Sequence, residues 1–210
     1  MIFINNFWRL KKKYLNIFFN KKLNISGKIN FGSKKANRFF QSEIKKSKFF
    51  FEYGSGVSTI YVDKKLKKYI SIESDKYFYN SLSQKLNNNQ SLKYFNLGIV
   101  GEFSYPLYCS KQQVKNYVGS INKYFKKNNF PDLILVDGRF RIACCLNLFD
   151  KLKKYKKIVI ILDDYKSRTE YQYLKKFYKI KKIGRLGILK PKKYIYFNKK
   201  LIEKYYLNCK

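Results

Sequence analysis

The sequence of 210 residues contains no histidine. This absence excludes His-ligated zinc or iron, a Ser-His-Asp triad and a Cys-His dyad, and it removes the side chain that most often exchanges protons near pH 7. No run of 18 apolar residues occurs, so no membrane-spanning helix is expected. Acidic residues number only 13, so a carboxylate at a special position stands out.

Cysteine is also rare. The sequence has four cysteines and no Cys-x-x-Cys pair, and two of the four are adjacent: Cys109, Cys144, Cys145 and Cys209. This pattern predicts reduced, mostly buried thiols in a cytoplasmic protein and no disulfide framework.

The charge is strongly one-sided. Lys and Arg total 47, of which six are Arg, and the net charge is +34. The excess of Lys accompanies abundant Asn, Ile, Tyr and Phe, a profile typical of AT-rich genomes. A basic surface also favours polyanions and anionic membranes. Because Lys is spread along the whole chain, we expect the charge to mark no specific nucleic-acid site.

The N-terminal segment, residues 1–20, combines short apolar runs with Lys11-Lys12-Lys13. Two interpretations remain open: a helix packed on the domain, and an interfacial helix on an anionic membrane surface. The expected location is therefore cytoplasmic, with peripheral membrane association under the second interpretation.

Short apolar runs alternate with helical patterns along the chain. The runs predict strands at residues 49–53, 69–73, 92–96, 132–137 and 158–162, and helices at 58–68, 76–87, 110–127, 139–154 and 169–176. Two further runs flank Gly184 and predict a hairpin. This order predicts an α/β fold with a Rossmann-like, doubly wound, mostly parallel sheet and an antiparallel C-terminal hairpin. We expect a helical extension at residues 1–47, the sheet domain at 48–191, and a basic aromatic tail at 192–210 packed on that domain.

In such a sheet, ligands bind beyond the carboxyl ends of the strands. The first predicted strand leads into Glu52-Tyr53-Gly54-Ser55-Gly56-Val57-Ser58-Thr59, where the glycines permit a tight turn and the following helix offers free N–H groups. Thr59 stands where a dinucleotide fingerprint has Gly or Ala, which argues against a pyrophosphate site. Glu52 would suit the ammonium group of an amino-acid ligand. The alternative is a simple strand-to-helix turn.

Acids follow the other predicted strands. Glu73 ends the second strand, where a carboxylate can accept both ribose hydroxyls, although a lone acid is often just solvated. Asp137 ends the fourth strand, and Asp163 and Asp164 end the fifth. These three aspartates could supply a general base or hold Mg²⁺, or they could balance Lys and cap helices.

Three arginines lie beside these aspartates: Arg139, Arg141 and Arg168. Because Arg is rare in this chain, each suggests a need for the planar, forked guanidinium group. That need is either an internal pair with a strand-end aspartate or the binding of a carboxylate or phosphate of a substrate.

Together these residues resemble class I S-adenosylmethionine-dependent methyltransferases over roughly residues 49–190. The chain is similar to a bacterial branch with the motifs EYGSGGST, VDGRFR and DDY..R..Y. The motifs correspond here to Glu52–Thr59, Val136–Arg141, and Asp163–Tyr165 followed by Arg168 and Tyr171.

The resemblance implies S-adenosylmethionine as cofactor and assigns roles to residues. Glu52, Gly54 and Gly56 would border the methionine part and Glu73 the ribose. The full set of implied cofactor-binding residues is Glu52, Gly54, Ser55, Gly56, Ser58, Thr59, Glu73 and Asp137. The implied catalytic residues are Asp137, Asp163, Asp164, Arg139, Arg168 and Tyr165. Catechol-type methyltransferases place metal-binding acids after the fourth and fifth strands, which makes Asp137, Asp163 and Asp164 the residues for Mg²⁺ if a metal is used.

The activity implied is methyl transfer to a small-molecule or glycan-precursor acceptor, with oxygen as the expected methylated atom. One alternative is an RNA methyltransferase or nucleic-acid-binding protein that uses the basic surface. Another is a non-catalytic, membrane-associated relative. The sequence indicates no particular acceptor and no oligomeric state.

Overall fold

The computed structural model describes residues 14–15, 23, 25–126, 129–152, 155 and 158–207. The interpretations of residues 1–20 as a packed or membrane-surface helix therefore fall outside the described residues, apart from the exposed Tyr14 and Leu15, and so does Cys209. No helix within the described ranges combines the length and the apolar character needed to cross a membrane.

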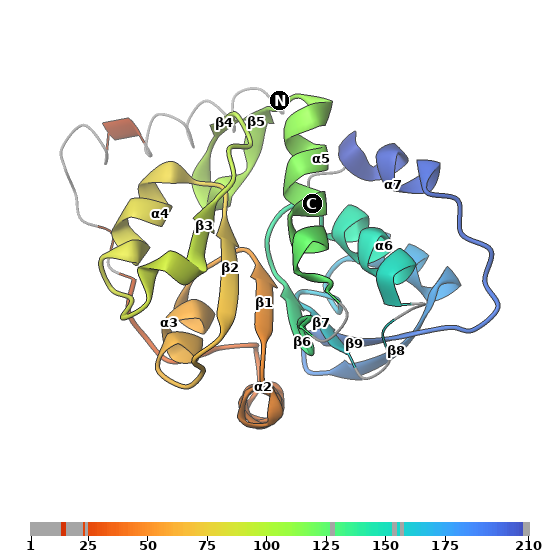
Figure 1. Cartoon of the computed structure of the whole chain (residues 1–210), viewed down its shortest axis with the longest axis horizontal. Helices are drawn as coiled ribbons and strands as arrows, with labels where there is room; N and C mark the ends of the chain where they lie inside the picture. Colours follow the sequence, from red (N-terminus) through yellow and green to blue (C-terminus); the bar gives the residue numbers. More distant parts are fainter. Residues whose placement is uncertain are drawn as a thin grey trace.

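The centre of the structure is a seven-stranded sheet with the order β3-β2-β1-β6-β7-β9-β8 (Figure 1). The first five strands in this order are parallel, and β9 runs antiparallel to both β7 and β8. The predicted fold class, including the antiparallel hairpin, is confirmed. The bounds in spatial order are Leu92–Tyr94, Tyr69–Glu73, Phe50–Tyr53, Leu133–Val136, Val159–Leu162, Leu186–Pro191 and Tyr178–Ile183.

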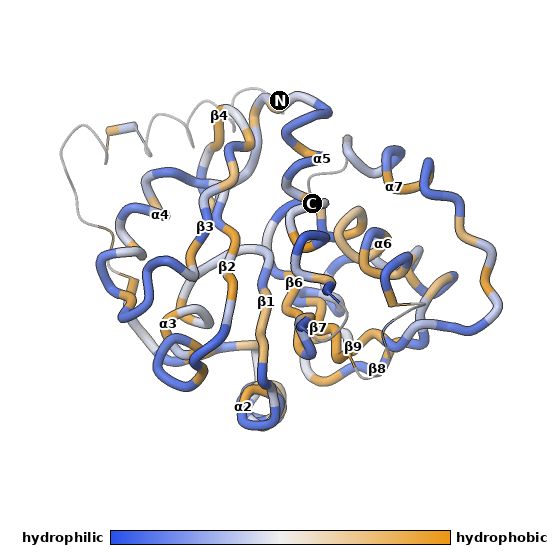
Figure 2. Tube along the Cα trace, in the orientation of Figure 1, coloured by the Kyte–Doolittle hydropathy of each residue, from blue (hydrophilic) through white to orange (hydrophobic). Residues whose placement is uncertain are grey.

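Alternate side chains of the central strands enter two different cores. In β1, Phe50 packs with α2 (Lys34–Lys46) and α3 (Val57–Asp63), whereas Phe51 and Tyr53 pack with α5 (Lys111–Gly119) and α6 (Arg141–Leu152). Both faces of the sheet are thus covered, which explains why β1 and β6 are buried at every position and why β6 is apolar throughout (Figure 2). Figure 1 shows α3 and α4 (Lys76–Ser83) beside β2 and β3, with α5, α6 and α7 (Lys200–Lys204) grouped on the other side.

Several predicted elements differ from the structure in length or in type. The predicted helix at 110–127 ends as α5 at Gly119 and continues as a 3-10 helix over Ser120–Tyr124, and the predicted helix at 169–176 is a 3-10 helix. The segment between the predicted strand at 92–96 and the predicted helix at 110–127 contains a two-stranded ribbon of β4 (Ile99–Val100) and β5 (Pro106–Tyr108). Strands of two and three residues are too short to show a sequence period, so the pattern could not reveal them.

Parts of both predicted flanking segments are described. Helix α2 lies within residues 1–47, and the Ser33 hydroxyl caps it by accepting from the Ala36 N–H at 3.2 Å. In the C-terminal tail, Ile202 of α7 is buried in the core that contains α6. The domain boundaries themselves stay a prediction.

The chain order places a crevice at one edge of the sheet. From β1 the chain moves outward to β2 and β3, and it then crosses to β6 on the other side of β1. The direction of winding therefore reverses between β1 and β6. At such a reversal the connections leave in opposite directions and open a space at the carboxyl ends of the strands.

Candidate active site

A cavity of about 450 Å³ lies at this edge. Its lining comes from the residues that follow three neighbouring strands: Gly54 and Ser55 after β1, Glu73 at the end of β2, and Asp137 and Gly138 after β6. A turn between β4 and β5, Glu102–Ser104, supplies a further wall. The volume is in the range of small-molecule and cofactor sites.

Two glycines allow the ends of β1 and β6 to meet at this cavity. Gly54 has φ +84°, and a Cβ atom built on it would lie 2.7 Å from both Cα and N of Gly138. Only a residue without a side chain fits there, because the backbone conformation and the space both exclude a Cβ. The Gly54 N–H donates to the Ile72 carbonyl at 3.0 Å, which continues the pairing of β1 with β2 past the strand end.

Glu73 is held at the cavity by four donors. The Ser74 and Asp75 backbone N–H groups donate to Oε1 at 2.7 and 2.8 Å, the Ser104 hydroxyl donates to Oε1 at 2.9 Å, and the Ser55 hydroxyl donates to Oε2 at 2.5 Å. Burial raises the pKa of Glu73, and these hydrogen bonds oppose that shift. The carboxylate is therefore fixed in orientation and accepts from hydroxyl groups, as the predicted ribose contact requires.

Glu52 points away from the lining of this cavity. Its carboxylate is fully buried beneath α3 and accepts hydrogen bonds from the Ser58, Thr59 and Ser71 hydroxyls, at 2.8 Å from Ser58 and 2.6 Å from Ser71. Ser58 and Thr59 also lie outside the lining residues of the cavity. In the structure, then, Glu52 anchors the first turn of α3 and so positions the Gly54–Gly56 turn. A direct contact of Glu52 with a cofactor stays a prediction.

The buried Glu52 predicts a distinctive pH dependence of stability. Burial raises its pKa from 4.5 to about 7, so the folded protein holds this proton more tightly than the unfolded chain. Its contribution to the free energy of unfolding therefore falls as pH rises from 4.5 to 7, by roughly 3 kcal/mol in total. Glu52→Gln is expected to unfold at higher denaturant concentration than the wild type at pH 8 and equally at pH 4. Urea titrations at both pH values measure this, and equal stability at pH 8 would contradict it.

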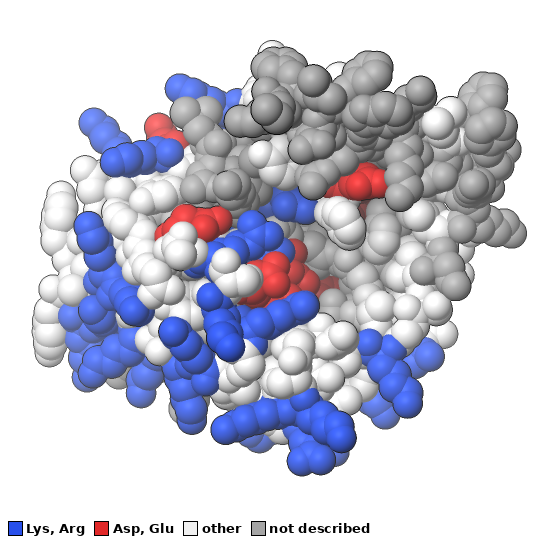
Figure 3. Space-filling model, turned by 180° about the vertical axis from the view of Figure 1, so that it is seen from behind, with Lys and Arg blue, Asp and Glu red and all other residues white. Residues whose placement is uncertain are grey.

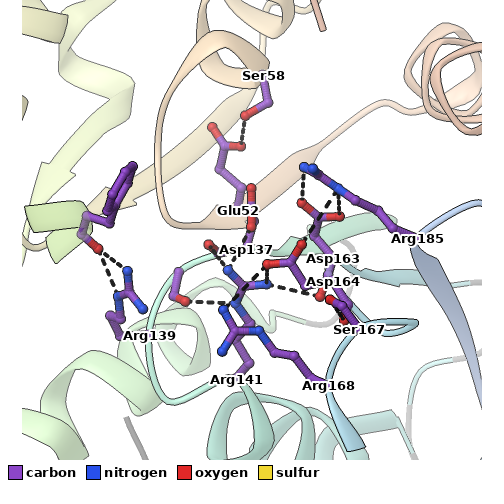
Figure 4. A network of polar contacts seen from close by, with 12 residues as sticks. Glu52, Ser58, Asp137, Arg139, Arg141, Asp163, Asp164, Ser167, Arg168 and Arg185 are labelled. Atoms are coloured by element: carbon purple, nitrogen blue, oxygen red, sulfur yellow. Dashed lines mark hydrogen bonds and ion pairs between the residues drawn. The ribbon is translucent and has the colours of Figure 1, made fainter. Parts of the chain in front are cut away.

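Asp137, Asp163 and Asp164 converge, as the predicted strand ends imply. One carboxylate oxygen of each lies within 4.8 Å of those of the other two. Arg141 lies between them with its Nη2 2.9 Å from Oδ1 of Asp137 and its Nη1 3.2 Å from Oδ2 of Asp164 (Figure 4). Arg141 also donates to the Asp137 and Asp163 carbonyls, each at 3.0 Å. For Arg141, the internal pair is the interpretation that the structure supports.

The sequence analysis missed Arg185, which completes this cluster. Arg185 lies in the turn of the β8–β9 hairpin, and it holds both oxygens of Asp163, with Nε at 2.7 Å and Nη2 at 2.6 Å (Figure 4). Such a two-bond pair orients a carboxylate rigidly. Arg is rare in this chain, which was the one sequence feature that could have drawn attention to Arg185. Only the folded hairpin brings Arg185 to the strand ends.

The three aspartates do not favour a metal ion. Mg²⁺ needs oxygen ligands in near-octahedral geometry and few competing cations nearby. Both oxygens of Asp163 already face Arg185, and Asp164 faces Arg141, with the Arg168 Nη2 at 3.6 Å. Guanidinium groups therefore already balance the charges that a metal ion would otherwise balance.

The comparisons with known proteins give one informative similarity. No protein-family model matches the sequence, and no curated protein matches it. A methyltransferase-like protein from Silicibacter pomeroyi has a similar structure, with 20% sequence identity, a TM-score of 0.66, and coverage of 84% of this chain and 95% of that one. The chain has a methyltransferase fold. An O-methyltransferase from Bacillus cereus in complex with SAH also matches, at 14% identity and a TM-score of 0.49, over 84% of this chain and 90% of that one.

In this methyltransferase fold, Asp137 is the member of the three-aspartate cluster that lines the cavity. Its side chain is 35% exposed, whereas that of Asp163 is 1% exposed. Although the side chain is partly exposed, the surrounding protein removes much of the water from the carboxylate and raises the pKa of Asp137 to about 7, with Arg141 acting against this shift and the Asp163 and Asp164 carboxylates adding to it. A carboxylate with that pKa can take up a proton at neutral pH.

The other predicted catalytic residues lie in different surroundings. Arg168 pairs with Asp164 and lies over the Tyr171 ring, 5.9 Å from its centroid. Tyr165 is fully buried, and its hydroxyl donates to Gln172 at 3.3 Å. Arg139 lines the cavity and donates to the Phe103 carbonyl from Nε at 2.9 Å and also from Nη2. Catalytic roles for Arg168 and Tyr165 stay predictions.

The charge distribution differs between this site and the rest of the surface. On the face drawn in Figure 3, acidic side chains gather near the middle with basic ones among them, whereas other Lys and Arg side chains spread toward the periphery. Four of the 13 acids line the cavity, namely Glu73, Asp75, Glu102 and Asp137, beside Arg139 and Arg141. The cavity is therefore locally acidic in a strongly basic protein, which suits a positively charged ligand.

Proposed function

We propose that the chain transfers a methyl group from S-adenosylmethionine to an oxygen atom of a small-molecule or glycan-precursor acceptor. The observation that carries the proposal is the cavity at the reversal point of a methyltransferase fold, with two abutting glycines, a fixed acceptor at Glu73 and a proton acceptor at Asp137. Bound S-adenosylmethionine supplies a methyl group already activated on a sulfonium ion.

The residues of the cavity fit such a cofactor. The Glu73 Oε1 atom already accepts from three donors, whereas Oε2 accepts from the Ser55 hydroxyl, so Oε2 is the oxygen that would accept from a ribose hydroxyl. Gly54, with no side chain, leaves the backbone of the first turn open to the ligand. The acidic lining would stabilise the positive charge of the sulfonium group.

Asp137 would act on the acceptor. Methyl transfer to a hydroxyl group requires alignment of the oxygen and removal of its proton. Asp137 follows β6, lines the cavity and is oriented by Arg141, so it can accept that proton once the acceptor is bound. Arg141 also donates to the Asp137 and Asp163 backbone carbonyls, and these bonds fix the guanidinium that holds the carboxylate in place.

Cofactor binding tests the proposal directly. Calorimetry is expected to show micromolar binding of S-adenosylmethionine and of its demethylated product, and no binding of NAD. Glu73→Gln should weaken binding of both by roughly 10- to 100-fold, because a hydrogen bond to a buried charged group is lost. Glu203→Gln, an exposed acid on α7, is the matched control and should bind as the wild type does. Binding of NAD with no binding of S-adenosylmethionine would overturn the proposal.

A further inference from the structure

The Glu102–Ser104 turn, here termed the strap, has an unusual backbone. Phe103 and Ser104 have φ values of +55° and +57°, so two consecutive residues with side chains adopt the left-handed region. The left-handed region is unfavourable for a residue with a Cβ atom, compared with the right-handed helical and extended regions. The local hydrogen bonds are those of a short turn, from the Gly101 N–H to the Tyr105 carbonyl at 2.8 Å and from the Tyr105 N–H to the Glu102 carbonyl at 3.2 Å. Contacts from elsewhere must therefore help to hold the strap.

Two such contacts hold the strap at the ends of two strands. The Ser104 hydroxyl donates to Glu73 at the end of β2, and the Arg139 guanidinium donates to the Phe103 carbonyl from beyond the end of β6. Strand β1 lies between β2 and β6 in the sheet. The strap thus links the strands on either side of β1, and its residues line the same cavity as Gly54 and Ser55.

The geometry of Arg139 matches a holding contact. Figure 4 shows Arg139 directed away from the cluster of Asp137, Asp163 and Asp164, and its guanidinium donates instead to the Phe103 carbonyl. Two N–H groups converge on one carbonyl oxygen, and the Tyr105 ring lies 5.7 Å from the guanidinium carbon. The planar guanidinium of Arg can direct two N–H groups at one acceptor and lie flat against an aromatic ring, whereas the ammonium group of Lys is not planar and has no such fork.

We propose that Arg139 is a positioning residue that holds the strap against the cofactor cavity. This inference rests on the proposed function and narrows it, because it assigns Arg139 to cofactor affinity and not to acceptor binding or proton transfer. The carbonyl partner is neutral, so the contribution of Arg139 comes from the direction of its two N–H groups more than from its charge. Loss of the two hydrogen bonds from Arg139 would release the strap from the end of β6. The hydrogen bond from Ser104 to Glu73 would then be the remaining described link.

The test uses calorimetry with S-adenosylhomocysteine as the probe, so that no acceptor is needed. Arg139→Lys keeps the charge but loses the fork, and we expect about tenfold weaker binding. Arg38→Lys, an exposed arginine on α2, is the matched control and should bind as the wild type does. If Arg139 acted through its charge, Lys would restore full affinity, and that result would overturn the inference.

A second variant tests the other end of the strap. Ser104→Ala removes the link to Glu73 and is expected to weaken binding by a similar factor. In the double variant, the loss of affinity should be smaller than the product of the two single losses, because each substitution releases the same segment. Independent, fully multiplicative effects would overturn the inference while leaving the proposed function intact. A wild-type protein that binds neither S-adenosylmethionine nor its product would overturn the proposed function, and this inference with it.

Discussion

Asp137→Asn is expected to lower the rate of methyl transfer by a factor of about 10² to 10⁴, the usual contribution of a positioned general base. Asparagine has nearly the same shape and keeps a carbonyl oxygen for Arg141, 2.9 Å away in the wild type. It cannot take up a proton, which the wild-type carboxylate can do near pH 7 because its pKa is raised to about 7. Affinity for S-adenosylmethionine should change much less than the rate.

The assay follows release of S-adenosylhomocysteine in the presence of a small-molecule fraction that supports turnover. Asp150→Asn removes a carboxylate outside the site, paired with Lys199 at 3.3 Å, and should leave the rate unchanged. Asp164→Asn should have a smaller effect than Asp137→Asn, because Asp164 is outside the cavity lining. Wild-type rates in both site variants would show that the acids are structural. Loss of activity on chelation, restored by Mg²⁺, would favour the metal role instead.

Gly54→Ala is expected to destabilise the fold by about 3 kcal/mol, the sum of a strained backbone and a forced separation of two strand ends. The added Cβ would lie 2.7 Å from the Gly138 backbone, and neither chain segment can move without breaking the pairing of β1 with β6. The cavity would be distorted as well, so cofactor affinity should fall with stability.

Thermal unfolding followed by circular dichroism measures this effect, and we expect a melting temperature lower by roughly 6–12 °C. Gly56→Ala is the matched control in the same turn. A Cβ on Gly56 would meet no atom within 4 Å, and its backbone is extended, so this variant should melt close to the wild type. Equal stability of the two variants would contradict the close packing of Gly54 against Gly138.

The prediction of the fold succeeded where the sequence pattern is strong and local. The run Leu133-Ile134-Leu135-Val136 is apolar at every position, as a strand covered on both faces must be, and it forms β6, which is one residue shorter at each end than the predicted strand at 132–137. Tyr69–Glu73 likewise matches β2. The helix at 169–176 was predicted as an ordinary helix because a single stretch of eight residues has too few turns to distinguish a 3-10 helix from an α-helix.

The sequence could not predict on which face of the buried strand β1 the Glu52 side chain lies. Glu52 was expected at the cavity because it precedes the glycine turn. Successive side chains of a strand point to opposite faces, and β1 is buried on both, so the pattern did not show which face Glu52 takes. In the structure it faces α3 and the serine and threonine hydroxyls there.

The sequence by itself determined that the sheet is mostly parallel and which residues end its strands, because these depend on local apolar runs and on the alternation of strands with helices. It thereby brought Glu73 and Asp137 to one edge. Only the tertiary structure decided the order of the strands and which groups contact the residues at this edge of the sheet. Arg185 reaches Asp163 from a hairpin 22 residues further along the chain, and Arg139 reaches the strap from 36 residues away. Such contacts depend on how separate elements pack, and packing leaves no period or spacing in the sequence that could reveal it.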